Sequence, residues 1–238
     1  MSSFTRLTDD EIGDIREVRF AVETAGQEAP GVLFYADGEE GMPLVVIQHP
    51  ATSSKDDYFV RDVGMMWARR GWACVGLDAP FHGERAGADP MKLLREREHF
   101  PAASAQFAAE LTAAVDAIAE KYPVDTGRMG YVGYSMGSML GIPAVAADGR
   151  YKAAAFCLVG EGGLLGSATA EGSPVGQLGG VAVRIVGKLS DEFFSRESTE
   201  ALYAALPGEK DLAWLPGGHF EIGPDVIKSA EQWLKRTL

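Results

Sequence analysis

Short apolar segments alternate with amphipathic helical segments through most of the chain, and this alternation constrains the fold more than any other feature. Nearly continuous apolar runs are typical of strands that are covered on both faces of a sheet. When helices separate such strands, the strands pack in parallel with helices over both faces. The runs that fit this pattern are Leu44–Ile47, Trp72–Leu77, Met129–Gly133, Ala153–Val159, Val181–Val186 and Asp211–Leu215. The sequence therefore predicts an α/β fold with a mostly parallel sheet.

The N-terminal part of the chain has a different pattern. Arg16–Val22 alternates charged and apolar residues, and Gly31–Tyr35 follows after a turn-forming stretch. Alternation of this kind predicts an antiparallel hairpin at one edge of the sheet, which brings the expected total to eight strands. A length of 238 residues suits one large core, so we expect a single domain over residues 1–238. Residues 161–180 are rich in glycine and predict a short loop in place of a cap domain, either a plain connection or a functional lid.

Charge and cysteine content exclude several classes of protein. The chain has 22 basic and 34 acidic residues and a formal net charge of −12, which disfavours nucleic acids and anionic membranes as partners. Its N-terminus lacks the apolar segment of a signal peptide, and no apolar run is long enough for a membrane span, so we expect a cytoplasmic protein. Cys74 and Cys157 fall inside predicted buried strands, as expected for reduced core thiols.

The pentapeptide GYSMG, residues 133–137, follows the apolar Tyr131-Val132 and precedes a helical segment of small residues. A serine between two glycines at such a junction is typical of a nucleophile elbow, because the glycines let strand and helix approach without Cβ clashes. The following helix also presents backbone N–H groups and its positive dipole end to a developing negative charge. Ser135 is therefore the candidate nucleophile.

A serine hydroxyl needs a base to accept its proton, usually histidine, with a carboxylate that orients the imidazole. His219 follows the last predicted strand and lies at the carboxyl edge of the sheet, where ligands bind in open α/β folds, so it is the best candidate base. His49 and His82 also follow predicted strands, and we expect structural roles for them. The acid should leave a strand end between Ser135 and His219, which favours Asp191. Its neighbour Glu192 and, less strongly, Glu161 stay as alternatives.

Stabilising the oxyanion of an acyl-transfer intermediate normally takes two backbone N–H groups. Met136, the residue after the candidate nucleophile, supplies the first. The second should come from the loop that begins at His49, where Pro50 has no N–H and Ala51 is the nearest donor. We expect Arg85 in this same edge region to form an ion pair that fixes its loop.

Together these segments resemble the α/β-hydrolase superfamily over nearly the whole chain. The segments that carry the resemblance are PLVVIQHPATSSKDD, RRGWACVGLDAPFHGER, RMGYVGYSMGS, GKLSDEFF and PGGHF, in the family's order. The hairpin start and the lack of a cap look like the bacterial carboxylesterase and dienelactone-hydrolase-like branches, with serine in place of cysteine at the elbow. The resemblance implies a Ser135, Asp191 and His219 triad, with Ala51 and Met136 as oxyanion donors. It departs from the family where His49-Pro50 replaces the usual His-Gly.

What the resemblance implies for function is hydrolysis of carboxylic esters with small to medium acyl chains, with no metal or organic cofactor. Aromatic residues near the predicted catalytic loops are candidates for contact with a small-molecule ester: Tyr58, Phe81, Phe193 and Phe220. The same triad also suits a thioesterase, an acyltransferase or a peptidase. A ligand-binding protein that kept the fold and lost turnover is a more remote alternative. The oligomeric state does not follow from the sequence.

Overall fold

The computed structural model describes residues 2–238, and over these residues the strands form a single nine-stranded sheet. The strand order is β1-β2-β3-β5-β4-β6-β7-β8-β9. Pairing is antiparallel from β1 to β5 along this order and parallel from β5 to β9. The strands are β1 (Ser3–Ile12), β2 (Ile15–Thr24), β3 (Gln27–Ala36), β4 (Met42–Gln48), β5 (Ala73–Leu77), β6 (Val124–Tyr134), β7 (Tyr151–Cys157), β8 (Ala182–Lys188) and β9 (Lys210–Leu215). The predicted mostly parallel sheet with an antiparallel N-terminal hairpin is confirmed.

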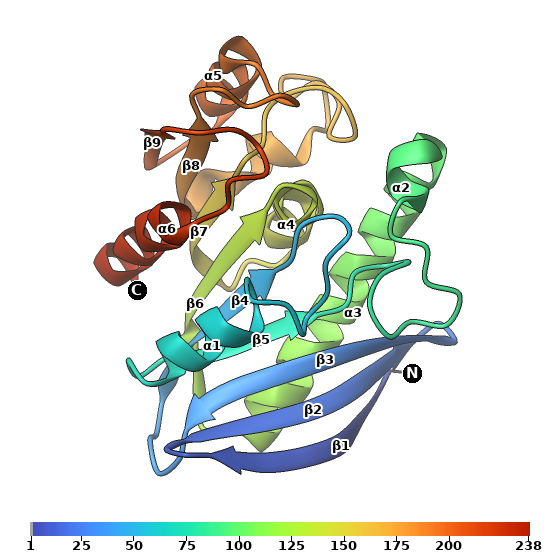
Figure 1. Ribbon diagram of the computed structural model, residues 1–238, viewed down its shortest axis with the longest axis vertical. Coiled ribbons are helices and arrows are strands. Elements are labelled where there is room, and N and C mark those ends of the chain that lie inside the picture. The colour runs from blue at the N-terminus through green and yellow to red at the C-terminus, as the bar shows by residue number, and fades with distance from the viewer. Residues whose placement is uncertain (1) are drawn as a thin grey trace.

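The sheet has one strand more than the eight expected. The additional strand is β1, which pairs only with β2 and forms one edge of the sheet (Figure 1). Most of its side chains are exposed, Leu7 among them. An edge strand that buries so little carries no apolar periodicity, which is why the sequence pattern does not reveal it.

Helices cover both faces of the sheet (Figure 1). On one face, α3 and α4 pack over a core that includes Phe107, Leu140 and Phe156. On the other face, α1 and α6 bury Trp67 and Trp233 against the strands. The helices are α1 (Arg61–Ala68), α2 (Lys92–Arg95), α3 (Phe100–Lys121), α4 (Met136–Ala147), α5 (Arg196–Ala205) and α6 (Pro224–Thr237), with 3₁₀ helices η1 (Arg97–His99) and η2 (Pro174–Gly180). Among the described residues, no helix is both long and apolar enough to cross a membrane.

The loops after the carboxyl ends of the parallel strands carry the candidate site. Arg85 lies in the loop after β5 and forms the expected ion pair, a two-contact pair with buried Glu110 of α3. Cys74 and Cys157 are buried free thiols, as predicted. The glycine-rich segment 161–180 consists of turns and bends that end in η2. The loops follow strands of the buried core, and β4 and β5 are buried over their whole length.

Candidate active site

Ser135 occupies a tight junction between β6 and α4. Its φ and ψ are 51° and −112°, a left-handed backbone conformation that is costly for a residue with a Cβ. A Cβ on Gly133 would lie 2.6 Å from the backbone of Gly137, and a Cβ on Gly137 would lie 2.5 Å from the carbonyl oxygen of Gln48. Both glycines are thus needed for the close approach of strand, helix and β4. The Ser135 backbone N–H donates to the Cys157 carbonyl oxygen at 2.8 Å, which holds the turn against β7.

The structure brings the Ser135, His219 and Asp191 side chains into one hydrogen-bonded series. Ser135 Oγ lies 2.8 Å from His219 Nε2, and His219 Nδ1 lies 3.0 and 2.9 Å from the two carboxylate oxygens of Asp191. Because an ionised carboxylate only accepts hydrogen bonds, the ring proton is assigned to Nδ1. Nε2 is therefore free to accept the serine proton. The loops after β6, β8 and β9 supply one residue each. Ser135 and His219 are buried, and the side chain of Asp191 is only 3% exposed.

The two adjacent acids after β8 have different partners. Asp191 Oδ1 also accepts the N–H groups of Phe193 and Phe194, at 2.8 Å each. Burial alone would raise the pKa of the Asp191 carboxyl, but the hydrogen bonds from His219, Phe194 and Phe193 outweigh it, and the pKa lies below its ordinary value of 3.8. Glu192 Oε2 instead accepts the backbone N–H of His219 at 2.7 Å. Asp191 therefore contacts the imidazole, while Glu192 fixes the position of the histidine backbone.

Glu161, the third acid considered, takes no part in this series. Its carboxylate accepts hydrogen bonds from Ser167 Oγ and from the Ala168 N–H, both within its own loop. The contact of Glu192 with a backbone N–H was not anticipated, because a sequence pattern shows only that two acids are adjacent and not which way each turns.

Buried His49 controls the loop that carries the second candidate oxyanion donor. Its Nδ1 lies 2.8 Å from the Pro50 carbonyl oxygen, and its Nε2 accepts the Ala79 N–H at 3.0 Å. These partners assign the proton to Nδ1. The described chain has no cis peptide bond, so the C=O and N–H of the Pro50–Ala51 unit point in opposite directions. With the carbonyl directed at His49, the Ala51 N–H points away from that ring.

Electrostatics keep His49 neutral. Burial, together with the nearby His82 ring, lowers its pKa from the ordinary 6.5 to about 3. His82 is also buried, and its centroid lies 5.3 Å from that of His49; desolvation lowers its pKa too. The structural role expected for these two histidines thus matches their surroundings. The sequence did not predict that His49 orients the Pro50 carbonyl group. The adjacency of the histidine and the proline was its only sign in the sequence.

The four candidate substrate-contact residues separate into two groups. Phe193 and Phe220 surround His219, with ring centroids 4.7 and 5.8 Å from its centroid, and they contact each other edge to face at 5.5 Å. Tyr58 is exposed and packs against Phe59. Phe81 is partly buried against the core, under the Lys92 ammonium at 4.9 Å. Of these four residues, Phe193 and Phe220 are thus the two that contact the candidate base, His219.

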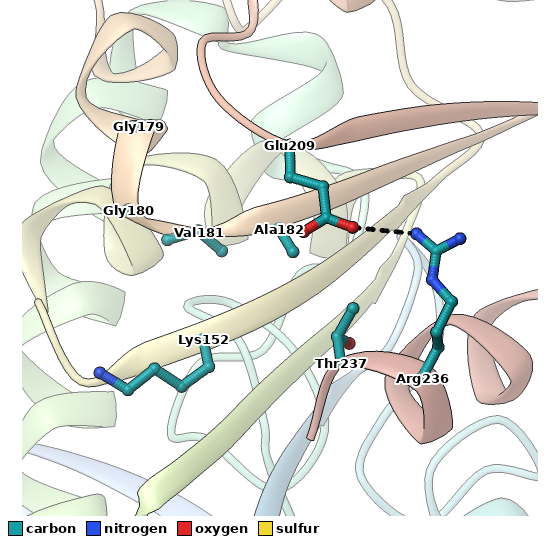
Figure 2. Close-up of a pocket in the computed structure, with 8 residues that line it drawn as sticks. All are labelled: Lys152, Gly179, Gly180, Val181, Ala182, Glu209, Arg236 and Thr237. Carbon is teal, nitrogen blue, oxygen red and sulfur yellow. Dashed lines mark hydrogen bonds and ion pairs between the residues drawn. The ribbon is translucent and has the colours of Figure 1, made fainter.

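Two surface hollows lie at different edges of the sheet. One, of about 570 Å³, is lined at the amino ends of β7 and β8 by Lys152 and Ala182, and the Glu209–Arg236 ion pair also lines it (Figure 2). It lies at the edge opposite to Ser135, so we do not assign it to the candidate site. The other, of about 350 Å³, lies beside the loop that carries His219 and is bordered by Phe220. Among residues 2–238, no three metal-ligating side chains gather at one point.

Comparison with known proteins supports the class of fold. No protein-family model matches the chain, and no curated protein matches its sequence. Among solved structures, the chain is similar to a PEG-bound cold-adapted esterase from an Arctic intertidal metagenomic library, with 28% identity, 97% coverage of each chain and a TM-score of 0.83.

More distant neighbours agree on the fold. An acetyl xylan esterase from Paenibacillus sp. R4 has 15% identity and a TM-score of 0.71, with 100% of this chain and 89% of that chain covered. A putative dienelactone hydrolase from Klebsiella pneumoniae has 16% identity and a TM-score of 0.72, with 93% and 99% covered. The chain has the α/β-hydrolase fold, and its structural neighbours are esterases and dienelactone-hydrolase-like proteins.

Proposed function

We propose that this protein is a serine hydrolase of carboxylic esters, with Ser135 as nucleophile, His219 as general base and Asp191 as the acid that orients the imidazole. The hydrogen-bonded series from Ser135 Oγ through His219 to Asp191 is the observation that supports this best. The esterases among its structural neighbours support the same activity.

In this mechanism Ser135 Oγ attacks the ester carbonyl carbon while His219 Nε2 accepts the hydroxyl proton. The N–H groups of Ala51 and Met136 stabilise the charge that develops on the carbonyl oxygen. His219 then donates the proton to the alcohol oxygen, the bond between that oxygen and the carbonyl carbon breaks, and the alcohol leaves an acyl group on Ser135. Water, deprotonated by His219, then attacks the acyl carbonyl carbon. The bond from that carbon to Ser135 Oγ breaks, His219 returns the proton to the serine oxygen, and the carboxylic acid leaves. Hydroxyl, imidazole and carboxylate suffice for these steps.

The substrate we propose is a small-molecule ester with a small to medium acyl group. A short connection of turns, bends and one 3₁₀ helix over residues 161–180, in place of a cap domain, supports a short acyl chain, and so does a structural neighbour named as an acetyl xylan esterase. Tyr58, Phe81, Phe193 and Phe220 are the proposed contact residues. We also propose a single domain over residues 1–238 and a cytoplasmic location, which two buried free thiols support.

Replacement of the nucleophile tests the proposal. We expect Ser135→Ala to lower kcat on p-nitrophenyl acetate by about 10⁴- to 10⁶-fold and to abolish labelling by a fluorophosphonate probe. Ser167→Ala removes a serine hydroxyl from an exposed loop and should leave both readouts unchanged. Acyl-CoA and peptide amides assayed in parallel separate an esterase from a thioesterase or a peptidase. Full turnover by Ser135→Ala on the best substrate would contradict the mechanism.

A further inference from the structure

An exposed aromatic pair lies against the candidate base. Phe193 is 61% exposed and Phe220 is 78% exposed, although both are large apolar side chains that normally lose water contact on folding. We call them the Phe193–Phe220 pair. We propose that this pair binds the alcohol portion of the ester, and not its acyl portion, so that the enzyme prefers esters of neutral aromatic or apolar alcohols. This inference rests on the proposed function.

The chemistry of proton return identifies which part of the ester meets the pair. His219 Nε2 must come within hydrogen-bond reach of the alcohol oxygen to protonate it as it leaves. The carbon atoms attached to that oxygen therefore lie beside the imidazole. The ring of Phe193 is 4.7 Å from the imidazole, centroid to centroid, and Phe220 adjoins both rings. A group of the size of benzyl on the alcohol oxygen is long enough to reach them.

The charges around the pair favour a neutral alcohol. Glu192 and Glu221 flank it, and each carboxylate accepts a backbone N–H of the loop that carries His219. The nearby ammonium of Lys188 is occupied by Asp225 and the Pro216 carbonyl oxygen. Lys188 is therefore already paired and does not offer its charge to an anionic leaving group. The net charge of −12 of the protein also opposes binding of polyanions such as coenzyme A.

The reaction sequence separates binding of the alcohol from binding of the acyl group. The alcohol is present during acylation and leaves with the proton from His219 when its C–O bond breaks. Hydrolysis of the acyl-enzyme then involves only the acyl group and water. Residues that bind the alcohol should therefore change kcat/KM, which reports acylation, and should leave the rate of hydrolysis of a common acetyl-enzyme unchanged.

The experiment compares benzyl acetate with methyl acetate, because methanol and benzyl alcohol have nearly equal acidities and yield the same acetyl-enzyme. We expect the native protein to show a kcat/KM at least about tenfold higher for benzyl acetate, since aromatic contacts and burial each contribute on this scale. Phe193→Ala and Phe220→Ala should each lower that ratio about threefold, and the double variant should bring it to about one. These variants should lower kcat/KM for methyl acetate by a smaller factor than for benzyl acetate, because methyl acetate carries no group that reaches the pair. Leu7→Ala, which removes an exposed apolar side chain from β1, is the matched control.

A second measurement uses the reverse step. With p-nitrophenyl acetate as donor, benzyl alcohol and methanol compete with water for the acetyl-enzyme, and the pair should favour formation of benzyl acetate in the native protein but not in the double variant. An unchanged ratio in the double variant, or no preference for benzyl acetate in the native protein, would overturn the inference. Turnover that persists in Ser135→Ala would instead overturn the proposed function, so the two failures are distinct.

Discussion

The two halves of the candidate active site are built in different ways. In the half that carries Ser135, backbone packs directly on backbone: Gly137 of α4 lies against the carbonyl groups of Gln48 and His49 at the end of β4. In the half that carries His219, carboxylate side chains hold the loops by accepting backbone N–H groups, as Asp191 and Glu192 do. Buried backbone contacts have no room to adjust, whereas a side-chain hydrogen bond can be replaced by another acceptor.

This difference predicts how each half responds to substitution. A change in the Ser135 half should lower stability and activity together, because the same packing holds the fold and the proposed oxyanion donors. A change in the His219 half should lower activity with a smaller loss of stability. Three substitutions test this contrast, in order of decreasing effect, and a fourth, in the Ser135 half, tests whether His49 is held neutral.

Asp191→Asn should have the largest effect among them. An amide in place of the carboxylate favours the wrong imidazole tautomer, and we expect kcat to fall by about 10⁴-fold. The free energy of unfolding should fall by only about 1–2 kcal/mol, because the Phe193 and Phe194 N–H groups keep an oxygen acceptor. Steady-state kinetics and urea unfolding measure the two quantities. A loss of stability larger than that of Gly137→Ala would contradict the contrast between the halves.

Gly137→Ala should affect both properties. The new Cβ would lie 2.5 Å from the Gln48 carbonyl oxygen and 2.8 Å from that of His49, so α4 or the β4 loop must move. We expect about 3 kcal/mol less stability and a kcat lower by about 10²- to 10³-fold, as when an oxyanion donor is displaced. Gly149→Ala is the control, since no atom lies within 4 Å of its new Cβ. If Gly137→Ala were less stable but kept a normal kcat, the packing of Gly137 would not determine the oxyanion geometry, and the prediction would be wrong.

Glu192→Ala should have an intermediate effect on activity. It removes the acceptor for the His219 backbone N–H, and we expect about a tenfold lower kcat at nearly unchanged KM. Glu192→Gln keeps an oxygen acceptor and should recover most of the loss. If both variants lost activity equally, the negative charge of Glu192 and not its backbone contact would be responsible.

His49→Asn should change the pH dependence of stability. The folded protein keeps His49 neutral down to about pH 3, whereas the unfolded chain protonates it below its ordinary pKa of 6.5. The contribution of neutral His49 to the free energy of unfolding is therefore complete above pH 6.5, and it is lost as the pH falls from 6.5 toward 3. Between pH 7 and pH 5 the native protein should lose about 2 kcal/mol more unfolding free energy than His49→Asn, as urea titrations would measure. Equal losses would mean that His49 is not held neutral.

Much of the fold could be predicted because buried parallel strands have a strong apolar signal, as Leu44–Ile47 and Val181–Val186 illustrate. The strand β1 lacked that signal, since its side chains are mostly exposed. The order of Ser135, Asp191 and His219 along the chain was readable because each follows a strand that ends at the same edge. The different orientations of Asp191 and Glu192 were not, because they depend on a turn in which Asp191 accepts the N–H groups two and three residues ahead.

The left-handed backbone of Ser135 also limits how heat-resistant this protein can become. At a φ of 51°, glycine would relieve a strain of about 1–2 kcal/mol that serine must bear. Selection by thermal survival alone would therefore favour glycine at this position and would discard the proposed nucleophile. A stabilised form that keeps turnover must gain its stability elsewhere in the molecule.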